Sequence, residues 1–233
     1  MNEGEQAGVD RARVEDLAAE IAQRGREVRA RIEAAARGPV EVVAVTKGHP
    51  PEIAAAALLA GYRTLGENYA QELRQKAAIL AACDWLPAAE WHFVGRLQSN
   101  KVRLMADAVS VWQSLDRPSA IDAVAKRCEG ARVMVQVDLA GMEGRGGCDR
   151  AEVAGLVEHA RGAGLDVIGL MGVGPPGDPE DSREGFDWLA REAATLGLSE
   201  VSMGMSADLE VAVEQGATMV RVGSALVGAR PPR

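Results

Sequence analysis

The chain has 233 residues, of which 47% are hydrophobic and 26% charged, and its net charge is -8. This length allows one large domain or two small ones, and the composition is that of a folded globular protein, which excludes disorder, collagen and a coiled-coil rod as the main state. The acidic balance also argues against binding to nucleic acid or to an anionic membrane.

The cysteines and the N-terminus bear on the compartment. Cys83, Cys128 and Cys148 are widely spaced and form no C-x-x-C pair, as expected in a reducing compartment, and with three histidines they form no metal-ligand cluster. The first eight residues are polar and are expected to form a disordered tail rather than a signal peptide. No apolar run is long enough to span a bilayer. Together these features predict a cytoplasmic protein, and the cysteines and histidines predict no metal site.

Helical and strand-like patterns alternate along the rest of the chain. A long amphipathic helix is predicted from Val14 to Ala35, ended by Gly38-Pro39. Eight strands are then predicted at Val40–Thr46, Tyr62–Leu65, Trp91–Val94, Ala108–Trp112, Arg132–Leu139, Leu165–Met171, Val201–Met203 and Thr218–Val222. The helical segments that follow them are expected at 50–60, 68–82, after Ser99, and at 116–128, 150–163, 178–196, 206–215 and 224–227.

Strict alternation of strands and helices implies a parallel sheet of an α/β protein. Eight units in this length favour a closed (β/α)8 TIM-type barrel, and the doubly wound sheet is second because no G-x-G-x-x-G opens the first helix. We expect residues 9–233 to form a single barrel domain, with the N-terminal helix as an extra element on its outside.

The first candidate for chemistry is a lysine at the end of the first strand. Functional sites of such barrels lie at the carboxyl ends of the strands, where Lys47 follows an apolar run. Partial burial there would lower the pKa of its amine and free the lone pair for attack on a carbonyl, and the alternative is an ordinary surface lysine. Lys76 is expected to form a solvated ion pair with Glu72 on a helix, which leaves Lys101 as the rival.

A candidate anion site follows the last two strands. Ser206 is expected to cap the next helix, and Gly223 and Ser224 form a glycine turn leading into a helix N-terminus, where barrels often bind phosphate. The structural alternative is a simple turn and cap. Arg221 lies within an apolar strand and must face the barrel or a charged ligand, because an unpaired buried arginine is costly.

Two further polar residues have structural explanations of their own. Asn68 has Gln71 three residues later, which is a capping-box pattern, so helix capping alone would explain it. His92 lies in the third strand without an evident nucleophile or carboxylate partner and is weak evidence for catalysis. A lysine and a phosphate site at one barrel mouth nevertheless suit a phosphorylated aldehyde, either pyridoxal 5'-phosphate (PLP) or a sugar phosphate in a lysine-dependent aldolase.

Six segments in chain order make the sequence similar to the pyridoxal phosphate homeostasis protein family, which resembles the barrel domain of alanine racemase. The segments are Val43–Lys47, Gly66–Tyr69, Trp91–Gly95, Leu97–Lys101, Ser202–Ser206 and Val220–Ser224. Gly48 and the loops 140–148 and 172–176 depart from the commoner family pattern, and these departures concern the pocket rim.

The resemblance implies a PLP site with assigned roles. Lys47 would form the internal aldimine with PLP, Asn68 would lie near the ring, and Arg221 would face the pyridine nitrogen. An arginine there cannot accept the ring proton, so the ring would be a weaker electron sink than beside a carboxylate. Ser206, Gly223 and Ser224 would bind the phosphate. His92 and Met203 would line the pocket.

The resemblance also implies a function in intracellular vitamin B6 homeostasis, in which the protein holds PLP without a dedicated reaction. The alternative is a weak racemase-like enzyme. An alanine racemase takes a tyrosine base with a separate β domain, and we expect this chain to lack both, because it ends soon after the eighth strand and neither Tyr62 nor Tyr69 matches. A Schiff-base aldolase and a barrel without a ligand also stay open. The expected partners are PLP and, as its recipients, apo PLP-dependent enzymes, and no binding to nucleic acid or membrane is expected. The expected oligomeric state is a monomer, with a dimer as the alternative.

Overall fold

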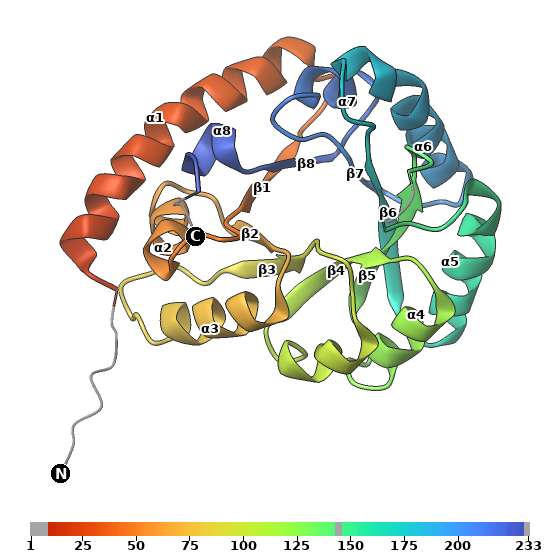
Figure 1. Cartoon of the computed structure of the whole chain (residues 1–233), viewed down its shortest axis with the longest axis horizontal. Coiled ribbons are helices and arrows are strands. Elements are labelled where there is room, and N and C mark those ends of the chain that lie inside the picture. The colour runs from red at the N-terminus through yellow and green to blue at the C-terminus, as the bar shows by residue number, and fades with distance from the viewer. Residues whose placement is uncertain (1–8, 143–145, 231–233) are drawn as a thin grey trace.

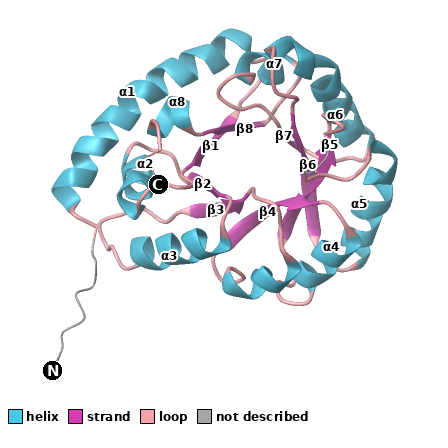
Figure 2. Ribbon diagram, in the orientation of Figure 1, coloured by secondary structure: helices cyan, strands magenta, loops and turns pink. Residues whose placement is uncertain are grey.

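Eight parallel strands close into a barrel in chain order, from β1 to β8 and back to β1 (Figures 1 and 2). The computed structural model describes residues 9–142 and 146–230, so the expected tail at 1–8 and part of the loop 140–148 lie outside the described residues. The strands are β1 (Glu41–Val45), β2 (Thr64–Glu67), β3 (Glu90–Phe93), β4 (Val109–Leu115), β5 (Arg132–Asp138), β6 (Asp166–Val173), β7 (Glu200–Ser202) and β8 (Met219–Val222). The predicted (β/α)8 barrel is confirmed.

Helices surround the barrel in the described part of the chain. The α-helices are α1 (Arg11–Ala35), α2 (Pro51–Leu59), α3 (Ala70–Ala81), α4 (Pro118–Ala125), α5 (Val153–Gly162), α6 (Arg183–Thr195), α7 (Leu209–Glu214) and α8 (Ser224–Val227). Three short 3-10 helices are η1 (Ser99–Leu104), η2 (Arg150–Glu152) and η3 (Pro179–Ser182). Within the described ranges, no helix is both long enough and apolar enough to cross a membrane.

The strands separate two apolar cores because successive side chains point to opposite faces. Val43 and Val45 of β1 point into the barrel, where they meet Met134, Met171 and Met219. Residues of the other parity, such as Ala44, join the larger core between the strands and the helices. Burial on both faces explains why the strands are near-continuous apolar runs.

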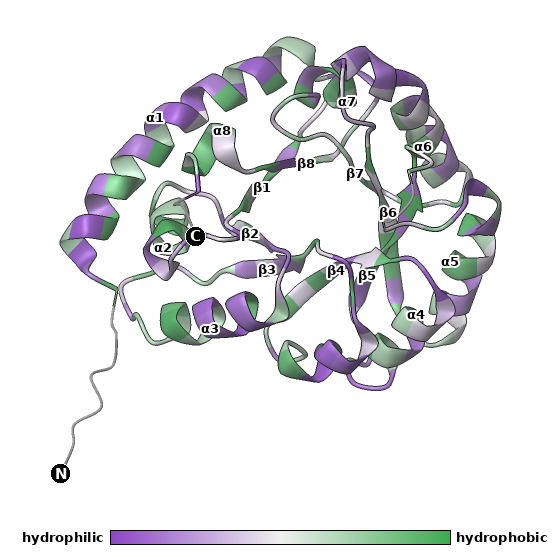
Figure 3. Ribbon diagram, in the orientation of Figure 1, coloured by the Kyte–Doolittle hydropathy of each residue, from purple (hydrophilic) through white to green (hydrophobic). Residues whose placement is uncertain are grey.

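The extra helix α1 covers the outside of the barrel next to α2, α7 and α8 (Figure 1). Its buried residues follow helical spacing and are Val14, Ile21, Gly25, Val28 and Ile32. In Figure 3, apolar and polar residues alternate along this helix. Because α8 is only four residues long, α1 supplies cover that a longer last helix would otherwise give.

Several predicted boundaries were wrong in detail. The segment predicted as a helix from 116 to 128 is α4, which starts later because Pro118 takes the first helical turn, where its missing N–H costs nothing. The segment after Ser99 is a 3-10 helix. Strand β2 starts at Thr64, two residues later than predicted, since Tyr62 is buried beneath α1 with Arg29 stacked on its ring.

Candidate functional site

A cavity of about 510 Å³ opens at the carboxyl ends of the strands. Six of the eight predicted site residues line it, from β8 and from the segments after β1, β2, β7 and β8. They are Lys47, Asn68, Ser206, Arg221, Gly223 and Ser224. The structure therefore brings together residues that are up to 177 positions apart in sequence, from Lys47 to Ser224.

Lys47 continues the inward-facing row of β1, two residues beyond Val45. The residue is half-buried, and burial lowers the pKa of its amine. The positive charges of Arg230 and Arg221 lower this pKa further, whereas the negative charge of Glu67 raises it. A lysine with a lowered pKa has more free amine near neutral pH, which is what attack on an aldehyde requires.

Lys76 forms the predicted ion pair with Glu72, but the lysine is buried rather than solvated and lies closer to a second carboxylate. Only 3% of its side chain is exposed, and its Nζ lies 2.6 Å from Oε1 of the fully buried Glu67, whereas Oε2 of Glu72 is 3.7 Å away. Glu72 and Lys76 do lie one turn apart on α3, as their i,i+4 spacing predicts. The helix face that carries Lys76 is, however, packed against the end of β2 rather than exposed to solvent. The burial of Lys76 had no local signal in the sequence.

Asn68 lies at the cavity, and its predicted role as a helix cap was wrong. Helix α3 begins at Ala70, and the residue at its N-cap is Tyr69. The Oδ1 atom of Asn68 is buried and has no hydrogen-bond partner among the described residues. The backbone of Asn68 packs against Gly95, where a Cβ would overlap the Asn68 carbonyl. A buried acceptor left open beside a cavity is a feature that a bound donor would satisfy.

The loop after β7 carries Ser206 without a capping role, because α7 begins at Leu209 and its N-cap residue is Asp208. Asp208 instead accepts a hydrogen bond from the Met205 N–H at 2.6 Å. From α1, Arg31 donates to the Ser206 carbonyl at 3.0 Å and forms a salt bridge with Glu210. These bonds fix the backbone of the loop and leave the Ser206 side chain at the cavity.

Next to the Ser206 loop, the cavity is lined by the turn from β8 into α8. Gly223 precedes the helix, and Ser224 and Ala225 are its first residues. The first N–H groups of a helix have no acceptor within the helix, so this turn offers donors to an anion. With the Ser206 and Ser224 hydroxyls, it forms a neutral, donor-rich wall of the cavity.

Arg221 is 5% exposed and forms the inner side of the cavity. Its guanidinium donates to Oγ of Ser202 and to the carbonyl of Gly172, each at 2.7 Å, and among the described residues no carboxylate forms a salt bridge with it. Burial lowers the pKa of Arg221 to about 10, so the side chain stays protonated at neutral pH. Its charge is therefore available to an anionic ligand.

His92 and Met203 are buried and are not among the residues that line the cavity. His92 lies inside the barrel, where its Nδ1 and the Nε2 of Gln113 are 2.7 Å apart. Gln113 accepts from Ser202 at 2.7 Å, so a hydrogen-bonded chain runs from His92 to Arg221. Burial lowers the pKa of His92 to about 3, which leaves the imidazole neutral.

The cavity is also lined by Gln136 and Arg230, which were not among the predicted site residues. Gln136 lies in β5 and donates to the Gly146 carbonyl at 2.8 Å, and a polar residue within a strand is the only signal that could have identified it. Arg230 lies beyond the last helix, where no pattern indicates orientation.

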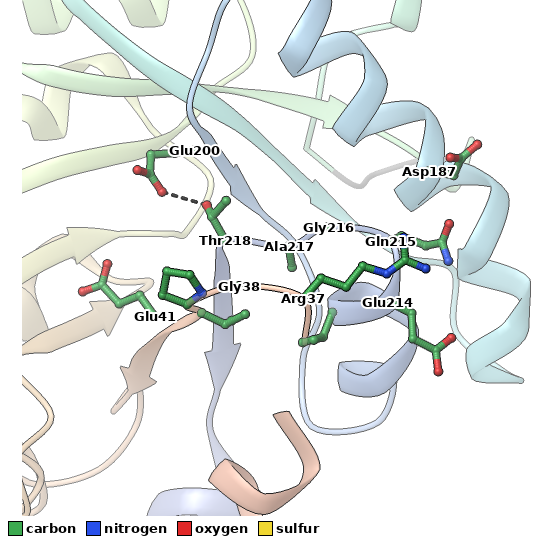
Figure 4. Close-up of a pocket in the computed structure, with 13 residues that line it drawn as sticks. Arg37, Gly38, Glu41, Asp187, Glu200, Glu214, Gln215, Gly216, Ala217 and Thr218 are labelled. Atoms are coloured by element: carbon green, nitrogen blue, oxygen red, sulfur yellow. Dashed lines mark hydrogen bonds between the residues drawn. The ribbon is translucent and has the colours of Figure 1, made fainter. Parts of the chain in front are cut away.

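Another cavity, of about 850 Å³, lies at the opposite end of the barrel (Figure 4). It is lined by the starts of β1 and β8 and by acidic side chains that include Glu41, Glu200 and Glu214, with Arg37 among them. Thr218 donates to Glu200 at 2.7 Å. The acidic lining disfavours a phosphorylated ligand.

Comparisons with known proteins show the family of this chain. A family model of the alanine racemase N-terminal domain matches residues 17–231. A pyridoxal phosphate homeostasis protein of Deinococcus radiodurans is 40% identical over 195 residues, which covers 82% of this chain and 90% of that protein.

Solved structures give the same result. PipY of Synechococcus elongatus, solved without and with PLP bound, superposes with TM-scores of 0.80 and 0.77 at 31% and 30% identity, covering 89% of this chain and 100% of PipY. An alanine racemase from Corynebacterium glutamicum has a TM-score of 0.71 at 20% identity over 92% of this chain and 62% of the racemase, which shows a shared fold.

Proposed function

The chain belongs to the pyridoxal phosphate homeostasis protein family, and from this premise we propose that it binds PLP at the carboxyl-end cavity and serves in vitamin B6 homeostasis. In this proposal residues 9–233 form the PLP-binding barrel domain. When bound, PLP supplies an electrophilic aldehyde at one side of its ring and a phosphate at the other. The observation that carries the proposal is that Lys47 and the donor-rich Ser206, Gly223 and Ser224 line one cavity.

The residues present fit such a ligand at each of its polar positions. The amine of Lys47, with its lowered pKa, would bind the aldehyde carbon covalently. Ser206, Gly223 and Ser224 would hold the phosphate. The open Oδ1 of Asn68 would accept a hydrogen bond, and Arg221 would lie at the ring nitrogen, to which a guanidinium can only donate.

A holding role without a dedicated reaction agrees with the cavity walls. The described residues that line the cavity include no carboxylate, histidine, tyrosine or cysteine, so Lys47 is the one side chain among them that can serve as a base. Neither tyrosine lines it, and the neutral His92 lies below, bonded to Gln113. Racemization by two opposed bases needs a second such group on the other face of the substrate. We therefore favour a PLP carrier over a weak racemase-like enzyme.

The wider setting of this role is part of the same proposal. A carrier in a reducing compartment such as the cytoplasm agrees with three free cysteines, of which Cys148 has a pKa raised to about 12 by burial. Apo PLP-dependent enzymes are the proposed recipients, and a monomer is the proposed state.

The absorption spectrum of the purified chain with added PLP tests the function. We expect a visible band that borohydride removes, with the added mass on the peptide of Lys47. Lys47→Ala should abolish the covalent mass, whereas Lys101→Ala, the rival lysine near the same end of the barrel, should keep it. A wild-type chain that takes up no PLP, or mass on Lys101, would contradict the proposal, and cleavage of a sugar phosphate would favour an aldolase.

A further inference from the structure

A buried ion pair lies directly behind the turn that carries Lys47. Glu67 is 0% exposed and Lys76 is 3% exposed. Glu67 has the same parity in β2 as Leu65, whose side chain joins the core between strands and helices. The pair therefore lies between the barrel wall and α3, outside the cavity itself.

The pair and its neighbour Glu72 hold the residues on both sides of Lys47. Lys76 donates from Nζ to the Thr46 carbonyl at 2.8 Å, and Oγ1 of Thr46 donates to Oε1 of Glu67 at 2.7 Å. On the other side, Oε2 of Glu72 accepts from the Gly48 N–H at 2.8 Å.

The backbone of this turn is in a conformation that needs such support. Gly48 has a φ of +72°, in the left-handed region that favours glycine. The Thr46 carbonyl also accepts from the His49 N–H at 3.1 Å, so the turn is closed by its own backbone as well as held by side chains of α3. A hydrogen-bonded turn with fixed ends restricts the position of the Lys47 Cα atom and the direction in which its side chain leaves the backbone.

Packing alone does not explain the ion pair. A buried pair loses much of its attraction to desolvation, and apolar side chains of similar volume often serve stability as well. Helix α3 already has the apolar anchors Leu73 and Leu80 for docking. Fixing one local arrangement is a role in which buried charges are useful, because any other arrangement leaves a charge unpaired.

We propose that Glu67, Glu72 and Lys76 are positioning residues for Lys47, which fix its turn so that Nζ reaches into the cavity. This inference rests on the proposed PLP site. None of the three residues lines the cavity, so they act through the backbone of Thr46 and Gly48 rather than on the ligand.

The first test removes the pair while preserving volume and net charge. In a Glu67→Gln/Lys76→Met double variant, PLP uptake at Lys47 should be about tenfold slower or more, since small misplacements of reacting groups have such effects. Arg74→Ala, an exposed change on the same helix, is the control and should match the wild type. A folded double variant with the wild-type uptake rate would overturn the proposal.

A second pair of variants covers the case in which the double variant does not fold. Glu72 is 33% exposed, so Glu72→Ala should fold while it removes the acceptor of the Gly48 N–H. Uptake should slow in Glu72→Ala and recover in Glu72→Gln, whose amide oxygen can still accept. Equal rates in the Ala variant and the wild type would overturn the role of Glu72.

A readout without PLP separates this inference from the proposed function. Acetic anhydride labels free amines, and mass spectrometry gives the ratio of Lys47 to Lys101 labelling within one molecule. This ratio should change in the double variant and in Glu72→Ala, and return in Glu72→Gln. If the wild type binds no PLP, the proposed function fails, and the ratio still decides whether these residues position Lys47.

Discussion

At the scale of the residue, Asn68 and Lys76 show how tertiary context reassigns a side chain. Each occupies a position to which a local helix rule gives a role, a cap for one and a surface ion pair for the other. The structure leaves the oxygen of Asn68 open beside the cavity and buries Lys76 against Glu67. A local rule cannot show either outcome, since both depend on strands and helices that meet only after folding.

Asn68→Ala should weaken PLP binding by about threefold to tenfold, the usual net value of one hydrogen bond. Thermal stability should hardly change, because Oδ1 has no partner among the described residues and the side chain caps no helix. Titration of the PLP band gives the affinity, with Asn100→Ala in η1 as the control. A loss of stability with unchanged affinity would assign Asn68 to the fold instead.

At the scale of the element, α1 does more than cover the barrel. Arg31 reaches from this helix to Glu210, with N–O distances of 2.5 and 2.7 Å, and to the carbonyl of Ser206. The hydrogen bonds that Arg31 donates to Glu210 raise the pKa of the guanidinium and lower the pKa of the carboxyl group. The extra helix is thereby tied to the loop proposed to hold the phosphate.

Arg31→Ala should therefore weaken the affinity for PLP by about threefold to tenfold, which is the net value of one hydrogen bond. The phosphate loop would lose its support, whereas the Lys47 turn, which Arg31 does not contact, would keep its geometry. Competition with inorganic phosphate measures the loop directly. Arg26→Ala, exposed on the same helix, is the control, and an equal loss in that variant would point to α1 packing rather than to the Ser206 contact.

At the scale of the whole molecule, a polar chain links strands across the barrel interior. It joins His92 of β3, Gln113 of β4, Ser202 of β7 and Arg221 of β8. The apolar residues around it, such as Met134 and Met219, fill the remaining space. The cavity proposed to hold PLP thus has a floor that is hydrogen-bonded as well as packed, and it includes a neutral His92.

The pH dependence of stability should report this histidine. The pKa of His92 is about 3 in the folded chain and 6.5 as an ordinary value, so between these values the unfolded chain binds the extra proton. The free energy of unfolding should therefore fall as pH decreases from about 6.5 towards 3, by about 1 kcal/mol per pH unit from this group. Urea unfolding at pH 7, 6 and 5 should show a shallower fall for His92→Gln. Parallel curves for the two proteins would exclude this origin.

The sequence by itself determined the barrel, the extra helix and the family, because periodic burial and short motifs are local signals. The sequence also predicts that Lys47, Arg221 and the Ser206 and Ser224 loops lie at one end of the barrel, since parallel strands place all their carboxyl ends together. Only the tertiary structure decided the partners of these residues: the open oxygen of Asn68, the burial of Lys76 behind Lys47, the reach of Arg31 to the Ser206 loop and the place of His92 below the cavity. Each of these depends on contacts between residues distant in sequence, which periodicity and capping rules do not encode.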